Sequence, residues 1–176
     1  FALLNKVSHF SMKIAFVGKG GSGKSTITSL FIKYLNEKQQ KVLAVDADIN
    51  MHLAAQLGVK LNPELALSKA DNAEKIRQYL RGTNERIKKV EHFVKTTPPG
   101  TGSHFATLLP DNYVMKEFSQ PFSRASYFMH VGTYESDTIG TACYHTNLAI
   151  FENVLSHIVL AENEWLVADM VAGTDA

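Results

Sequence analysis

The sequence is poor in cysteine, with Cys143 the single one among 176 residues. One thiol cannot form a disulfide within a chain. This excludes the small secreted domains that disulfides stabilise and makes a reducing cytoplasm the expected location. The sequence also lacks an apolar run of the roughly 20 residues that a transmembrane helix requires. It therefore offers no candidate transmembrane segment.

The sequence also lacks an excess of positive or of negative charge. The 18 lysines and arginines are balanced by 17 aspartates and glutamates, so the sequence gives no strong signal for nucleic-acid binding. With 45% apolar and 20% charged residues, the composition is that of a globular protein rather than a disordered one. A chain of this length is sufficient for one domain with a hydrophobic core.

What the sequence does contain is an alternation of short apolar runs with longer amphipathic patterns. The first strand, the helix after it and the second strand form a βαβ unit. This order favours an α/β fold with a mainly parallel sheet flanked by helices on both faces, which binds ligands at the carboxyl ends of its strands. The expected strands are 13–17, 41–48, 127–132 and 165–170, and the expected helices are 24–39, 72–94 (two helices, or one broken at Gly82) and 145–161.

Apolar residues at three-to-four spacing predict which side of a helix meets the core. In the helix 145–161 this pattern selects four positions, and in the helix 24–39 it selects five. The predicted core residues are Leu148, Phe151, Leu155 and Ile158 in the former, and Ile27, Leu30, Phe31, Tyr34 and Leu35 in the latter.

The stretch GKGGSGKS, residues 18–25, fits the pattern G-x-x-x-x-G-K-[ST] of a phosphate-binding loop (P-loop) between a strand and a helix. Glycines let backbone N–H groups point at phosphate oxygens, and the helix N-terminus adds positive partial charge. Lys24 is expected to bridge the β- and γ-phosphates, and the Ser25 hydroxyl to bind Mg²⁺. The alternative is a glycine-rich turn without nucleotide. The expected phosphate-binding residues are Gly18, Lys19, Gly20, Gly21, Ser22, Gly23, Lys24, Ser25 and Thr26.

The second lysine of this loop, Lys19, has a specific precedent. KGGSGK resembles the deviant phosphate loop of the MinD/ParA class of ATPases, which have a P-loop NTPase fold. The resemblance implies ATP or ADP with Mg²⁺ as ligands and a homodimer that sandwiches the nucleotides. Lys19 would then reach the partner's phosphates and stabilise transition-state charge in trans, together with Lys24. The alternative is that Lys19 is an ordinary exposed loop lysine.

Acidic residues end two of the strands, in VDAD and in VADMVAG. By the same resemblance, Asp48 would orient or activate the attacking water. Asp46 would contact the ligands of the magnesium ion rather than the ion itself. Asp169 would hold Mg²⁺ through a water molecule, and Gly173 would offer its N–H to the γ-phosphate. The alternative for either residue of the VDAD pair is a strand-end carboxylate that caps the next helix.

Residues 143–173 resemble one branch of the class, the CooC-like ATPases that insert nickel during maturation of carbon monoxide dehydrogenase. In that branch a Cys-x-Cys pair opens a helix, and a strand ending in DMEAG follows. Here the pair is replaced by Cys143 and His145. Two chains would supply two thiolates and two imidazoles at a dimer axis, a set that suits Zn²⁺ and also Ni²⁺. The alternative is a small buried Cys143 followed by an ordinary first-turn histidine.

The resemblance implies a nucleotide-switched ATPase that acts on a client protein, which for the CooC-like branch is a metalloenzyme. The alternative is a partitioning or positioning ATPase that serves as a DNA- or membrane-associated scaffold. That function predicts a basic stripe or a terminal amphipathic helix, and neither is evident. The iron–sulfur branch is disfavoured because Ala172 occupies the position of its second cysteine.

The domain boundaries follow from the first apolar strand and from the resemblance. Met12 directly precedes that strand, so residues 1–11 are expected to be a tag or an upstream extension, or alternatively an edge strand or a dimer-packing arm. Residues 12–176 are expected to be the N-terminal part of a single P-loop ATPase domain that is truncated at its C-terminus. The segments that recognise the base would then lie beyond this sequence.

Overall fold

The computed structural model describes residues 11–123, 125–133 and 144–171, without side chains for 144–146. The expectations for residues 1–11, apart from Ser11, lie outside this range. The elements are, in chain order, β1 (Met12–Gly18), α1 (Lys24–Glu37), β2 (Lys41–Ala47), α2 (His52–Leu57), η1 (Pro63–Leu65), α3 (Ala70–Arg81), η2 (Val90–His92), α4 (Tyr113–Phe118), β3 (Gln120–Ser123), β4 (Ser126–His130), α5 (Tyr144–His157) and β5 (Glu164–Val171), where η marks a 3₁₀ turn.

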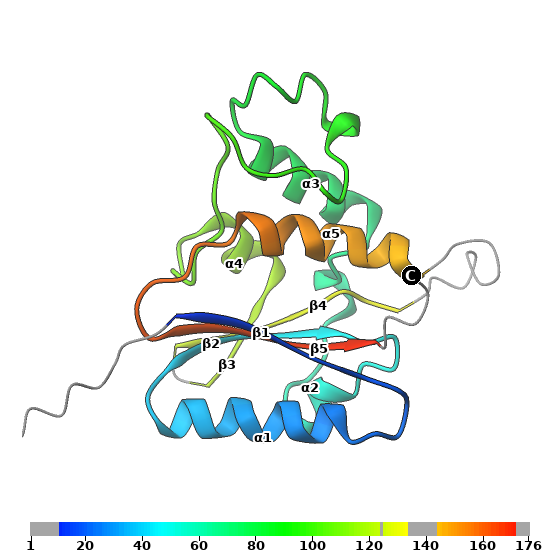
Figure 1. Cartoon of the computed structure of the whole chain (residues 1–176), viewed down its shortest axis with the longest axis vertical. Coiled ribbons are helices and arrows are strands. Elements are labelled where there is room, and N and C mark those ends of the chain that lie inside the picture. The colour runs from blue at the N-terminus through cyan, green and yellow to red at the C-terminus, as the bar shows by residue number, and fades with distance from the viewer. Residues whose placement is uncertain (1–10, 124, 134–143, 172–176) are drawn as a thin grey trace, which may run out of the picture.

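The five strands form one sheet in the order β1-β5-β2-β4-β3 (Figure 1). The first four strands of this order are parallel, and β3 pairs antiparallel with β4. The expected α/β fold with a mainly parallel sheet is therefore confirmed. Because parallel strands end at the same edge of a sheet, the carboxyl ends of β1, β2, β4 and β5 lie together there.

Helices cover both faces of the sheet: α1 and α2 lie on one face, and α4 and α5 lie on the other, with α3 packed against α5 (Figure 1). The side chains of β2 alternate between the two layers. Leu43 and Val45 join the core beneath α3, α4 and α5, whereas Val42 and Ala44 join the core beneath α1 and α2. This two-sided burial explains why the strand is a continuous apolar run.

The predicted core side of α1 is confirmed only in part, since Leu35 is buried and Phe31 packs against the core. Ile27, Leu30 and Tyr34 are each more than half exposed, so the prediction is wrong for these three residues. Small hydroxyl side chains take their place and allow close approach of α2, where the Ser29 hydroxyl donates to Gln56 Oε1 at 2.8 Å. The buried residues of α1 are Ser25, Thr28, Ser29, Ile32 and Leu35.

The segment 72–94 contains one helix, α3, and not a helix on each side of Gly82. The chain leaves α3 at Gly82, whose φ is 52°. The Arg81 guanidinium donates to the Ile87 carbonyl, and the Arg86 N–H donates to Asn84 Oδ1. These side chain–backbone bonds hold the following residues in an irregular path, where η2 is the one short turn. The prediction of a second helix is therefore wrong.

The remaining differences concern length. The pattern analysis did not predict α2, α4 or β3, which have four to six residues each. In α5 the predicted side does face the core, since Leu148, Phe151 and the following Ile158 are buried. No helix in the described parts of the chain is long and apolar enough to span a membrane.

Candidate nucleotide-binding site

The loop between β1 and α1 forms an open cradle. Gly21 and Gly23 have φ values of 77° and 82°, in the left-handed region that glycine adopts without strain. The Ser22 N–H donates to the Lys19 carbonyl at 3.1 Å and closes the turn. At Gly20, as at the other two glycines, an added Cβ would meet no atom within 4 Å. The loop thus presents its backbone to open space, as phosphate binding requires.

A cavity of about 280 Å³ lies against this cradle. The P-loop and the first turn of α1 form one part of its lining, and α2 with the residues before it forms the rest. The sequence patterns did not single out the α2 side, because a six-residue helix is too short to show a helical period. The lining residues are Gly20, Gly21, Gly23, Lys24, Ser25, Thr26, Asn50, His52 and Gln56.

Lys24, predicted to bind phosphates, forms an ion pair with Asp48, predicted to act on the attacking water. Both side chains are largely buried, at 11% and 4% exposure. Asn50 donates to Asp48 Oδ1 from its backbone N–H and from its side-chain amide, each at 2.9 Å. Burial pushes the pKa of Asp48 upward, but the hydrogen bond and charge of Lys24 and the bonds from Asn50 outweigh it. The pKa is lowered as a result, and Asp48 is ionised at neutral pH.

Asp169 lies on β5 directly opposite Asp46 of β2 and is fully buried. Neither of its carboxylate oxygens has a hydrogen-bond partner among the described residues. Burial raises its pKa and the charge of Asp48 raises it further, whereas the nearby Ser25 hydroxyl and the Lys24 ammonium act in the opposite direction. An unpaired buried carboxylate is costly. Carboxylate and hydroxyl oxygens are ligands that Mg²⁺ accepts, so these residues fit a magnesium ion.

Asp46 lies in β2 and accepts hydrogen bonds from the segment that follows this strand. Its Oδ1 accepts the Asp48 N–H at 3.3 Å, and its Oδ2 accepts the Leu53 N–H at 2.9 Å. Burial raises the pKa of Asp46 to about 7, against the effect of these bonds. The bonds are those of the capping alternative, because Leu53 lies in the first turn of α2. Asp46 therefore positions the loop that carries Asp48.

The other predicted residues are less well defined by the structure. Lys19 is exposed and makes no ion pair within the described part of the chain. Cys143, the side chain of His145 and Gly173 lie outside the described residues. Across the ranges that are described, no group of three or more His, Cys, Asp or Glu side chains lies close enough to hold a metal ion.

Comparison with known proteins agrees with this geometry. Residues 14–173 match the CobQ/CobB/MinD/ParA nucleotide binding domain. This chain belongs to that family. The matched range includes the P-loop, Asp48 and Asp169, which confirms the resemblance to the MinD/ParA class that the P-loop sequence indicated.

Two curated relatives align with most of the chain. The carbon monoxide dehydrogenase accessory protein CooC of Rhodospirillum rubrum is 29% identical over 167 residues, which are 93% of this chain and 56% of that protein. An uncharacterized ATP-binding protein of Methanocaldococcus jannaschii is 28% identical over 167 residues, 93% of this chain and 59% of the relative. The chain therefore spans less than two thirds of the length of these relatives.

Proposed function

We propose that this chain is the nucleotide-binding part of a dimeric ATPase that binds and hydrolyses Mg-ATP and uses the cycle as a switch. The observation that carries the proposal is the ion pair between Lys24 and Asp48 beside an open glycine cradle. A lysine held at the end of a P-loop by a carboxylate of the neighbouring strand can exchange that partner for phosphate oxygens.

The proposed roles follow from the positions of the side chains. Lys24 would leave Asp48 to bridge the β- and γ-phosphates, which frees the Asp48 carboxylate to accept a proton from the attacking water. Ser25 and Asp169 would hold Mg²⁺, which supplies charge neutralisation for the phosphates when bound. The exposed Lys19 is free to reach the nucleotide of a second copy of the chain and to act there in trans.

Nucleotide binding by the full chain tests the first part of this proposal. Isothermal titration with ADP and with a slowly hydrolysed ATP analogue should give saturable binding that tightens with Mg²⁺. Lys24→Ala should weaken nucleotide binding by tenfold or more, because the variant loses a buried, charge-assisted hydrogen bond to phosphate. The matched control is Lys33→Ala, which removes an exposed lysine further along α1. Equal affinity in both variants would contradict the assignment of the phosphate site.

We further propose that the client is a metalloenzyme and that the switch serves metal insertion. The support is the similarity to the accessory protein CooC, together with Cys143 and His145 near the start of α5. Ni²⁺ or Zn²⁺ would be the transported cargo, bound where two copies of the chain meet and supply two thiolates and two imidazoles.

Metal content per dimer tests this second part. The chain is loaded with Ni²⁺ or Zn²⁺, desalted and analysed with and without Mg-ATP, in parallel with Cys143→Ala and His145→Ala. We expect one metal ion per two chains, lost in both variants. Failure to retain metal in any nucleotide state would contradict the metal-insertion proposal and leave the ATPase proposal in place.

A further inference from the structure

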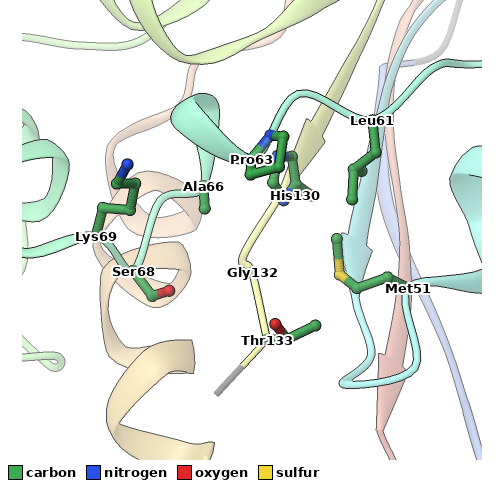
Figure 2. A pocket seen from close by; sticks show the side chains of 9 residues that line it. All are labelled: Met51, Leu61, Pro63, Ala66, Ser68, Lys69, His130, Gly132 and Thr133. Carbon is green, nitrogen blue, oxygen red and sulfur yellow. The ribbon is translucent and has the colours of Figure 1, made fainter. Parts of the chain in front are cut away.

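A second cavity, of about 270 Å³, opens at the same edge of the sheet beside the end of β4 (Figure 2). Met51 and Leu61 approach it from one side, Ala66 and Ser68 from the opposite side, and His130 lies between them (Figure 2). It has no lining residue in common with the phosphate cavity. The carboxyl edge of a parallel sheet is where ligands bind, and this cavity lies at that edge.

The loop after Asp48 separates the two cavities. Asn50 and His52 line the phosphate cavity, whereas Met51 between them lines the second one. Met51 has a φ of 52°, a left-handed conformation that is uncommon for a residue with a side chain. This conformation lets adjacent residues of the loop face different cavities. Met51 follows Asn50 directly, and Asn50 donates two hydrogen bonds to Asp48, so a shift of the backbone at Met51 would act on these bonds.

The lining of the second cavity suits an uncharged ligand. Met51, Leu61, Pro63 and Ala66 supply apolar surface, and no aspartate or glutamate lines it. The one cation of the lining, Lys69, is paired with Glu64 at 2.6 Å. Mg²⁺ would find no carboxylate among the lining residues, and most of the surface that a ligand would meet is apolar.

One polar group in the wall has an unmet hydrogen-bonding capacity. His130 is 2% exposed, and its Nε2 lies 2.9 Å from the Asn62 carbonyl oxygen. A carbonyl oxygen accepts and never donates, so Nε2 carries the hydrogen and Nδ1 carries a lone pair. Burial lowers the pKa of His130, which keeps the ring neutral. Nδ1 is buried without a partner among the described residues, and an N–H or O–H donor from a ligand would satisfy it.

We propose that this cavity binds a small, uncharged, mainly apolar compound carrying one N–H or O–H donor, and that its occupancy is coupled to nucleotide binding through Met51. The ligand site stands independently of the proposed ATPase function, and the coupling rests on nucleotide binding alone. By thermodynamic linkage, ligand and nucleotide must change each other's affinity by the same factor.

Indole and benzofuran form a matched pair of probes, since they have nearly the same size and benzofuran has an oxygen in place of the indole N–H. Each is titrated into the full chain while amide NMR signals are followed. Indole should give saturable shifts at Ser68 and Gly132 and bind about fivefold more tightly than benzofuran, as expected for one hydrogen bond. His130→Phe should abolish this preference. Absence of saturable shifts at these amides, or equal affinities for the two probes in the parent chain, would overturn the ligand site.

The coupling is tested by measuring the affinity for ADP with and without saturating indole. We expect a change of about fivefold, and the same factor when the indole affinity is measured with and without ADP. Met51→Ala should remove this effect while indole still binds, and Met12→Ala, at an exposed methionine of β1, is the control that should retain it. Unchanged ADP affinity in the presence of bound indole would overturn the coupling. ADP binding without indole reports separately on the proposed nucleotide site.

Discussion

Lys24 and Asp48 are paired with each other where the start of α1 meets the end of β2. The first is the P-loop lysine that phosphates would require, and the second is the carboxylate proposed to act on water. On the proposed role of Lys24, phosphate oxygens compete with Asp48 for this lysine. Asn50 donates two hydrogen bonds to Asp48, so a shift of that carboxylate would reach the loop that leads into α2. One ion pair thus links occupancy of the P-loop to the conformation of a neighbouring segment.

Asp48→Asn should strengthen nucleotide binding while it impairs hydrolysis. The substitution removes the carboxylate that competes with phosphates for Lys24, so ADP should bind several-fold more tightly, on the order of 1 kcal/mol. Hydrolysis should fall because an amide cannot accept a proton from water. Titration calorimetry and phosphate release measure the two effects, with Asp71→Asn at an exposed position of α3 as control. Weaker ADP binding in Asp48→Asn than in the control would be inconsistent with the competition.

Asp46→Asn should alter the pH dependence of stability. Burial raises the pKa of Asp46 from 3.8 to about 7. The folded chain thus binds this proton more tightly than the unfolded chain, and the resulting stabilisation is lost as the pH rises through 7. An uncharged asparagine avoids this loss. As the pH rises from 5 to 8, the free energy of unfolding of the variant relative to that of the parent should increase by about 2–3 kcal/mol. Urea unfolding at several pH values measures it, and a constant difference would refute the assignment.

Asp169→Asn should separate stability from magnesium binding. The parent residue is a buried carboxylate without a hydrogen-bond partner among the residues that the structure describes, so the neutral amide should raise the unfolding temperature at pH 8 by about 2–4 °C in the absence of nucleotide. The variant should also lose the tightening of ATP-analogue binding by Mg²⁺. Calorimetric scans and titrations with and without Mg²⁺ measure both effects. If Mg²⁺ still tightens binding to the same extent, Asp169 does not hold the ion.

Ile32→Ala and Leu30→Ala should differ sharply although both residues lie on α1. Ile32 is fully buried against the sheet, and its truncation should cost about 2–4 kcal/mol of unfolding free energy. Leu30 is 60% exposed, so its truncation should cost less than about 0.5 kcal/mol. Urea unfolding of the two variants measures the difference. Similar losses would mean that α1 has a different rotation about its axis.

The sequence predicted the features that depend on consecutive residues. The P-loop lies within eight positions whose glycines and lysine act together, and β2 and β5 are apolar runs with an aspartate near the carboxyl end. The rotation of α1 could not be predicted in this way. It depends on α2, which packs close to Ser29 and has only six residues. The helical period alone therefore assigned Ile27, Leu30 and Tyr34 to the core, although these three side chains are exposed.

The candidate site was predicted residue by residue but not as a network. Lys24 and Asp48 each had a proposed partner in the nucleotide, and the pattern contains no information on what pairs with them when nucleotide is absent. His130 has no spacing relationship with another histidine. Its position beside Met51 arises from the pairing of β2 with β4, a contact between segments about 80 residues apart, which requires the fold.

The proposal that Lys19 acts in trans is tested most directly by mixing two inactive variants, Lys19→Ala and Asp48→Ala. A mixed dimer then has one complete site, composed of Asp48 from the first variant and Lys19 from the second. At equal concentrations half of the dimers are mixed, so the mixture should recover about a quarter of the parent rate of phosphate release. A mixture as inactive as each variant alone would contradict the account of a dimeric ATPase with shared sites.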